Sequence, residues 1–166
     1  QRIGKTILAT VTDSYRKLRN TMRYLLGALD GFTEAERVAP ADMPPLEQYI
    51  LHRLWELDRD VRKAYAEYRF QDVVRPVLEF CSNDLSSLYF DIRKDSLYCD
   101  RPDSIRRRAA RTVMDEVFMR LTAWLAPLTP FTMEEAWGTF APESGSNCAR
   151  VIPETPAEWQ NAAEAT

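Results

Sequence analysis

A row of polar and basic side chains near the start of the sequence has the composition to bind phosphate groups. It consists of Lys5, Arg16, Arg19, Asn20 and Arg23, which lie within about 100° of one another on a helical wheel and span about 27 Å. Arginine presents a planar fork of N–H groups that matches phosphate oxygens, and asparagine can bond to a ribose hydroxyl or a base edge. We therefore predict an RNA-binding helix face. The spacing leaves one alternative open, a solvated face whose charges pair with acids of a neighbouring helix.

A second basic cluster lies at the start of a later predicted helix, where the helix dipole repels cations. Within the run of arginines there, Arg106 and Arg108 have no acidic partner nearby on the same helix, and they are candidates for a second phosphate contact. We favour the alternative that they pair with another helix or with the acidic C-terminal end. Residues 127–166 contain six Glu against Arg150 alone, whereas residues 1–27 contain six Lys or Arg against one Asp.

Catalytic chemistry has little support in the sequence. Asp84 and Asp91 are seven residues apart on one predicted helix and could do acid–base work, but such acids more often bond Trp, Tyr or Arg at a helix crossing. His52 is the single histidine, and neither G-x-x-x-x-G-K-[ST] nor G-x-G-x-x-G occurs. We predict no catalytic residue in this chain. A catalytic domain of its own would depend on the two aspartates alone.

The cysteines give no metal-binding pattern. Cys81, Cys99 and Cys148 are far apart, and no C-x-x-C pair is present. A structural zinc site needs about four ligands at close spacing, so no metal site is predicted. We expect reduced thiols that act as small packing residues in a cytoplasmic protein. No apolar run is long enough to cross a membrane.

The hydrophobic pattern predicts an all-α protein. Apolar residues recur at intervals of three and four through four long segments, and short connections between them predict an antiparallel bundle with a short fifth helix. The expected helices are about 4–29, 45–68, 70–98, 105–126 and 132–140.

The buried stripes of the predicted helices follow the 3.6-residue period. Pro76 lies inside the third helix, so we expect a kink or a later start there. The segment Thr132-Met133-Glu134-Glu135 has the form of a capping box and predicts the start of the fifth helix. The expected stripe is Ile7, Val11, Tyr15, Leu18, Met22, Leu25 and Leu29 in the first helix, and Val73 with Val74, Val77, Cys81, Leu85, Leu88 and Ile92 in the third.

The last part of the chain lacks this periodicity. Its Ser, Gly, Pro, Ala and Glu composition predicts a loosely held tail. We therefore divide the chain into a helical domain, residues 3–142, and an irregular tail, residues 143–166, which leads toward a missing C-terminal segment. Because the chain opens on Gln-Arg-Ile, we expect it to be a segment of a longer protein.

Three stretches of the sequence resemble, in order and at similar intervals, the anticodon-binding helical domain of isoleucyl-tRNA synthetase. That enzyme belongs to the class I aminoacyl-tRNA synthetases, in the isoleucine, valine, leucine and methionine subgroup. The Y-R-x-[IL]-R-N-T pattern favours isoleucine over valine, and L-x-P-x-x-P-F-x-x-E-E-x-W is shared more widely in the subgroup. The stretches are DSYRKLRNTMRYLL (13–26), DLSSLYFDIRKDSLY (84–98) and LTAWLAPLTPFTMEEAW (121–137), and the resemblance covers roughly residues 3–142.

The resemblance implies that the bundle packs along the anticodon stem of the isoleucine acceptor tRNA, as part of a monomeric cytoplasmic synthetase. The parent enzyme activates isoleucine with ATP and magnesium, and some members also bind zinc in a cysteine-rich C-terminal segment. Its catalytic signatures, HIGH and KMSKS, have no counterpart here, so this segment alone is expected to need no cofactor and to catalyse nothing. At matching positions Arg16, Arg19, Asn20 and Arg23 become candidates to face tRNA, while Tyr15 and Leu18 remain core.

Two alternatives to this function stay open. The chain could be the equivalent domain of a valyl-, leucyl- or methionyl-tRNA synthetase, which would use the same physical contacts for another tRNA. It could also be a helical protein-interaction module with no RNA partner, in which the basic flank binds an acidic protein.

Overall fold

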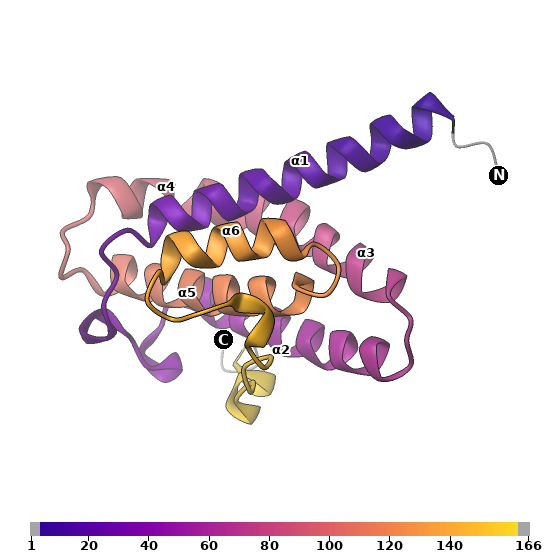
Figure 1. The fold of residues 1–166 in the computed structure, drawn as a ribbon. Helices are drawn as coiled ribbons and strands as arrows, with labels where there is room; N and C mark the ends of the chain where they lie inside the picture. Colours follow the sequence, from indigo (N-terminus) through magenta and orange to yellow (C-terminus); the bar gives the residue numbers. More distant parts are fainter. Residues whose placement is uncertain (1–3, 163–166) are drawn as a thin grey trace.

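The computed structural model describes residues 4–162, and for Ile7 only the backbone, so the predicted core position of the Ile7 side chain lies outside what it describes. All regular structure in this range is helical (Figure 1), which confirms the all-α fold class. A π-helix, η3 (Phe80–Tyr89), joins α3 to α4, so the third predicted helix is the composite rod α3–η3–α4. The α-helices are α1 (Lys5–Ala28), α2 (Pro45–Ala66), α3 (Gln71–Glu79), α4 (Phe90–Cys99), α5 (Ile105–Leu125) and α6 (Pro130–Phe140). Short 3-10 turns are η1 (Glu34–Glu36), η2 (Pro40–Asp42), η4 (Asn147–Ala149) and η5 (Ala157–Asn161).

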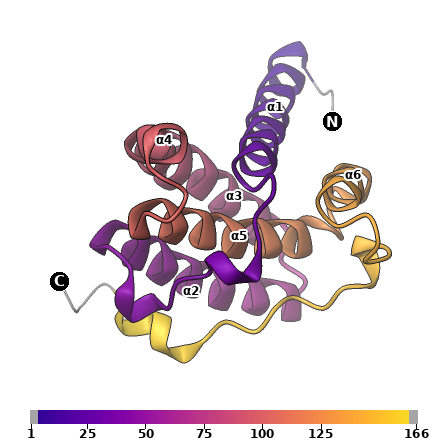
Figure 2. The ribbon, with the colours of Figure 1, turned by 90° about the vertical axis from the view of Figure 1, so that its left-hand side faces the viewer.

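Helix α5 lies at the centre of the bundle. It contacts α1, α2, α4 and α6, and Figure 2 shows α1 and α6 on one side of α5 with α2 on the other. Buried apolar side chains of different sizes line α5 and pack against the neighbouring helices. Among them Ala109, Val113, Phe118, Leu121 and Trp124 are fully buried.

The buried stripe of the composite rod differs from the predicted one. Val74, Leu88 and Ile92 are exposed, and Tyr89 is buried in place of Leu88. An α-helix drifts by about 40° when its buried residues repeat every four positions, whereas the i→i+5 bonds of a π-helix accommodate more residues per turn. The segment therefore keeps a spacing of four. Pro76 does not delay the start of α3, which begins at Gln71 and continues through it.

The fifth predicted helix begins earlier than expected. Helix α6 starts at Pro130, and Pro is favoured in the first turn because it lacks the N–H that would stay unpaired there. Thr132 makes no cap, so the predicted capping box is wrong. Its hydroxyl oxygen instead lies 2.7 Å from that of Tyr15 in α1.

The C-terminal segment is held more firmly than its composition predicts. Its described part runs along the bundle on the side of α2 (Figure 2), and the Trp159 side chain is buried. The Arg120 guanidinium stacks over the Trp159 ring at 4.5 Å and donates to the Glu154 carbonyl at 2.9 Å. The prediction of a loosely held tail is therefore wrong for the described residues. The domain boundary at residue 142 stays a prediction.

A buried ion pair joins α2 to the composite rod. Glu47 is fully buried, and its carboxylate accepts two hydrogen bonds from Arg93, at 2.6 and 2.7 Å. The Tyr89 hydroxyl donates to the same carboxylate at 3.1 Å. A buried charge is tolerated only when such partners satisfy it, so this network fixes how the two elements pack.

Glu47→Ala should lower the free energy of unfolding by about 3–5 kcal/mol, because it leaves the Arg93 charge in the interior without its carboxylate. Urea unfolding followed by circular dichroism measures this. Glu79→Ala, which breaks the exposed pair between Glu79 and Arg75, is the matched control and should change stability little. Equal effects of the two substitutions would contradict a structural role for the buried pair.

The cysteines differ in their environment. Cys81 is a buried packing residue as predicted, whereas Cys99 and Cys148 are exposed, so for these two the prediction is wrong. Burial raises the pKa of the Cys81 thiol to about 12, against a smaller opposite effect of a hydrogen bond with Thr21.

In the folded protein at neutral pH, Cys99 and Cys148 should react rapidly with a thiol reagent, and Cys81 should react only when the protein unfolds. Mass spectrometry of the alkylated peptides measures the three rates. Rapid labelling of Cys81 in the native protein would show that this part of the core opens readily.

Candidate nucleic-acid interface

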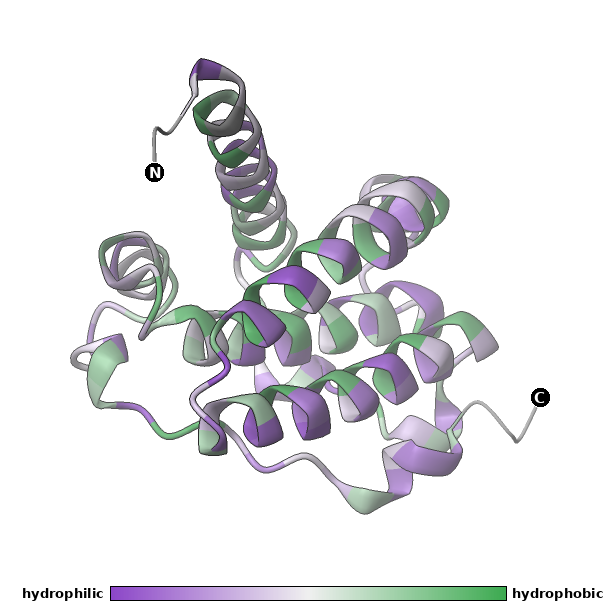
Figure 3. Ribbon diagram, turned by 90° about the vertical axis from the view of Figure 1, so that its right-hand side faces the viewer, coloured by the Kyte–Doolittle hydropathy of each residue, from purple (hydrophilic) through white to green (hydrophobic). Residues whose placement is uncertain are grey.

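The first half of α1 extends beyond the rest of the bundle (Figure 1). Leu18 is the first of its described side chains to be buried, whereas Val11 is 60% exposed and Tyr15 is 40% exposed. The predicted core positions are therefore confirmed for Leu18 and wrong for Val11 and Tyr15. The amphipathic pattern continues along the overhang, where Figure 3 shows apolar segments in green, but Leu8 and Val11 are exposed there.

The five residues of the predicted basic row are all exposed on α1. Arg16 pairs with Asp13 on the same helix, and Arg19 pairs with Glu135 of α6. The Lys5, Asn20 and Arg23 side chains make no hydrogen bond or ion pair with the residues that the structure describes. The row is thus an accessible polar and basic surface with one cross-helix ion pair, and its binding of RNA stays a prediction.

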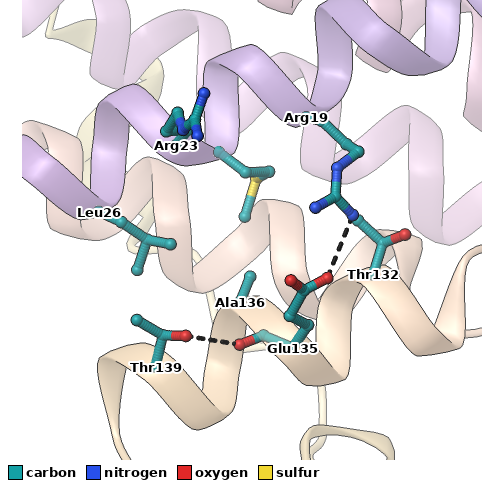
Figure 4. Close-up of a pocket in the computed structure, with 8 residues that line it drawn as sticks. Arg19, Arg23, Leu26, Thr132, Glu135, Ala136 and Thr139 are labelled. Atoms are coloured by element: carbon teal, nitrogen blue, oxygen red, sulfur yellow. Dashed lines mark hydrogen bonds and ion pairs between the residues drawn. The ribbon is translucent and has the colours of Figure 1, made fainter.

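A pocket of about 200 Å³ lies between α1 and α6 (Figure 4). At one end the Arg19 Nη1 atom is 3.1 Å from the Glu135 Oε2 atom. Two hydrogen bonds raise the pKa of Arg19: the one to the Tyr15 hydroxyl has the larger effect, and the one to Glu135 the next largest. The Arg19 guanidinium therefore stays charged. The pocket is also lined by apolar Met22, Leu26 and Ala136 and by polar Arg23, Thr132 and Thr139.

The other flank of α1 has a different chemical character. A groove of about 410 Å³ separates α1 from the π-helix, and Lys17 is its only charged lining residue. Its remaining lining side chains are uncharged and polar or small, and include Asn20, Ser82 and Ser86. Helix α1 is therefore a ridge with a charged flank toward α6 and a nearly neutral flank toward η3.

The second predicted cluster is engaged with the protein itself. Arg106 donates to both carboxylate oxygens of Asp100, at 2.9 and 3.0 Å, and this bond lowers the pKa of Asp100. Arg108 donates to the backbone carbonyls of Ala35 and Glu36. These contacts agree with the alternative that Arg106 and Arg108 bind other parts of the protein rather than phosphate. Their partners are the Asp100 carboxylate and two backbone carbonyls, however, and not the acidic C-terminal end.

The residues considered for catalysis do not come together in a site. Asp84 accepts a hydrogen bond from Tyr49 and pairs with Arg53, whereas Asp91 pairs with Lys94 at the surface. The ring of His52 bonds to the carbonyl of Gln160. Within residues 4–162, no three His, Cys, Asp or Glu side chains are grouped to hold a metal ion. No helix in this range is long and apolar enough to span a membrane.

The sequence analysis missed Glu135 as a neighbour of the basic row. Glu135 and Arg19 are 116 residues apart, so helical periodicity alone cannot bring them together. The one available signal was that Glu135 belongs to the L-x-P-x-x-P-F-x-x-E-E-x-W stretch, which shows the presence of the acid but not its partner.

Arg108→Ala should lower the free energy of unfolding by about 1–3 kcal/mol, because it removes charged hydrogen bonds to partly buried carbonyls. Arg23→Ala removes the same atoms from an exposed site and should change stability by less than about 0.5 kcal/mol. Chemical denaturation of both variants tests the distinction between structural and free arginines. A larger loss for Arg23→Ala would contradict it.

Comparison with known proteins gives two findings. Residues 47–166 match the family model described as the anticodon-binding domain of tRNA ligase. The isoleucine–tRNA ligases of Caulobacter vibrioides, Ruegeria pomeroyi and Brucella abortus are 69%, 59% and 53% identical to this chain. These matches include α1 and cover 97–99% of this chain, but they cover only 16–17% of the relatives' own length.

Proposed function

The chain belongs to the anticodon-binding domain family of tRNA ligases, and from this premise we propose that it is the tRNA-binding module of an isoleucine–tRNA ligase. The exposed row on α1 is its contact with the RNA. In the full-length protein the module holds the anticodon stem of the isoleucine acceptor tRNA. It thereby positions the tRNA for a reaction that takes place elsewhere on the polypeptide.

The single observation that carries this proposal is that the basic side chains on the α1 ridge are exposed and largely without protein partners among the described residues. Arg23 and Lys5 have no protein partner among the described residues, and the ion pair of Arg19 is open to solvent. Like charges at intervals of three and four repel one another and lower the stability of a helix. RNA offsets that cost, because each neutralised phosphate releases counterions.

The ridge binds mainly through charge. One row neutralises only a few phosphates, so the affinity is modest and falls as salt rises. Contacts to phosphate orient the RNA without reading its sequence, whereas discrimination between tRNAs requires contacts to base edges. Asn20, which lies in the row and can both donate and accept, is one candidate for such a contact or for a bond to a ribose hydroxyl.

The activity of the longer protein is part of the same proposal. It attaches isoleucine to its tRNA with ATP and magnesium, which bind to parts of the polypeptide that this chain does not span. Its location is the cytoplasm and its partner is tRNA, with each synthetase acting as a monomer. Support for isoleucine over valine, leucine or methionine comes from the names of the similar ligases.

Arg23→Ala should weaken the binding of all tRNAs alike, by about two- to fivefold near 0.1 M salt, because a phosphate contact carries no sequence information. It should also make the slope of log affinity against log salt shallower by about one. Fluorescence anisotropy with labelled tRNA over a salt series measures both quantities.

Arg59→Ala is the matched control for this experiment. Arg59 is an exposed arginine of α2. Helix α2 lies on the opposite side of α5 from α1 (Figure 2), so Arg59 should not contact the RNA. If both variants bind tRNA as the unmodified chain does, α1 is not the contact. Binding that is insensitive to salt would favour the alternative of a protein-interaction module.

A further inference from the structure

The N-terminal half of α1 is a helix without a buried face among its described side chains. Every residue between 4 and 17 other than Ile7, whose side chain is not described, is exposed or partly exposed. This half includes the part that extends beyond the bundle (Figure 1). A helix in a protein gains most of its stability from a packed face, and an isolated helix shorter than about 12–15 residues is marginal in water. This segment therefore has little support from packing.

The residue types in this half also favour a helix only weakly. Most side chains between residues 6 and 14 have low helix propensity, among them Thr6, Thr10, Val11, Thr12 and Ser14. The hydroxyl groups of Thr10, Thr12 and Ser14 each donate to the backbone carbonyl four residues earlier. Such bonds slightly destabilise a helix, because they compete with the backbone hydrogen bonds.

The start of α1 lacks the features that stabilise a helix end. Gly4 is the N-cap residue and gives no side-chain hydrogen bond, and the first turn contains no acidic residue. Lys5 places a positive charge where the helix dipole repels it. Farther along, the Tyr15 hydroxyl lies 2.7 Å from that of Thr132 in α6, so α6 supports the helix from about this residue onward.

We propose that residues 5–14 of α1 open and close in the absence of RNA, and that RNA bound along the basic row orders them as a helix. A segment that is weakly packed and weakly helix-forming opens at a low cost in free energy. Lys5 is in line with Arg16 and Arg23 only when the segment is helical, so RNA that contacts all three favours the helical state. This inference rests on the proposed function, because it requires that RNA lie along α1.

An arm that is ordered by its ligand has a measurable consequence. A substitution that favours the helix without touching RNA should tighten binding, because less of the interaction free energy is used to order the segment. Thr10 and Ser14 suit this purpose, since on a helical wheel they lie about 130° and 170° from the middle of the basic row. Within the described residues, the hydroxyl groups of both bond to carbonyls of α1 itself.

Two double variants test the proposal by fluorescence anisotropy with labelled tRNA. Thr10→Ala with Ser14→Ala should bind about threefold more tightly than the unmodified chain, because alanine is the best helix former. Thr10→Gly with Ser14→Gly should bind about threefold more weakly, since glycine is among the worst. Neither pair changes a charge, so the slope of log affinity against log salt should stay the same. Ala66→Gly, at an exposed position of α2, is the matched control and should leave the affinity unchanged.

Hydrogen–deuterium exchange gives a readout that does not depend on affinity. Without RNA, the amides of residues 9–14 should exchange at least about tenfold faster than those of residues 19–28, which belong to the packed half of α1. Saturating tRNA should slow the exchange of residues 9–14 by at least about tenfold. Both double variants should melt within a few degrees of the unmodified chain, because the substituted side chains lie outside the core.

The outcomes separate this proposal from the proposed function. If residues 9–14 exchange as slowly as residues 19–28 without RNA, the helix is preformed and the proposal is wrong. Equal affinities of the alanine and glycine variants would also overturn it. In either case the proposed function stands if Arg23→Ala weakens the binding of the same tRNA. If Arg23→Ala has no effect, RNA does not lie along α1, and ordering of the segment by RNA fails with it.

Discussion

Helix α5 is surrounded by other elements, and its burial constrains the rest of the structure. Its buried residues include charged side chains, which the interior tolerates only when they are paired. Arg111 donates to the carbonyls of Ala28 and Asp30 and pairs with Glu36, so it anchors the end of α1 and the connection after it. Arg120 holds the C-terminal segment in the same way. Segments that look irregular in the sequence are therefore fixed by the charges of one central helix.

This anchoring also explains why the arginines of the chain fall into two groups. Arg108 and Arg111 donate hydrogen bonds to backbone carbonyls. If these arginines bound a ligand instead, the partly buried carbonyls would lose their hydrogen-bond donors. Arg23 is exposed and lines the pocket between α1 and α6, and its side chain makes no hydrogen bond or ion pair with the residues that the structure describes. Burial and hydrogen bonding thus separate structural from available arginines more clearly than their number in the sequence does.

The two flanks of α1 differ in charge. Positive charge gives speed and affinity toward any polyanion, but it does not distinguish between RNAs. On the α6 flank the Glu135 carboxylate places one negative charge beside Arg19. The chain spans only 16–17% of the length of the ligases that it resembles.

The sequence alone determined the all-helical class, most helix boundaries and the buried positions of Leu18, Met22 and Leu25. These properties follow from the period of the α-helix, which is local and visible in consecutive residues. Only the tertiary structure decided that α1 overhangs the bundle and exposes Val11 and Tyr15, that the rod widens into a π-helix and buries Tyr89 in place of Leu88, and that Arg19 meets Glu135. Each of these depends on which element packs against which, and partners more than a hundred residues apart leave no trace in a local period.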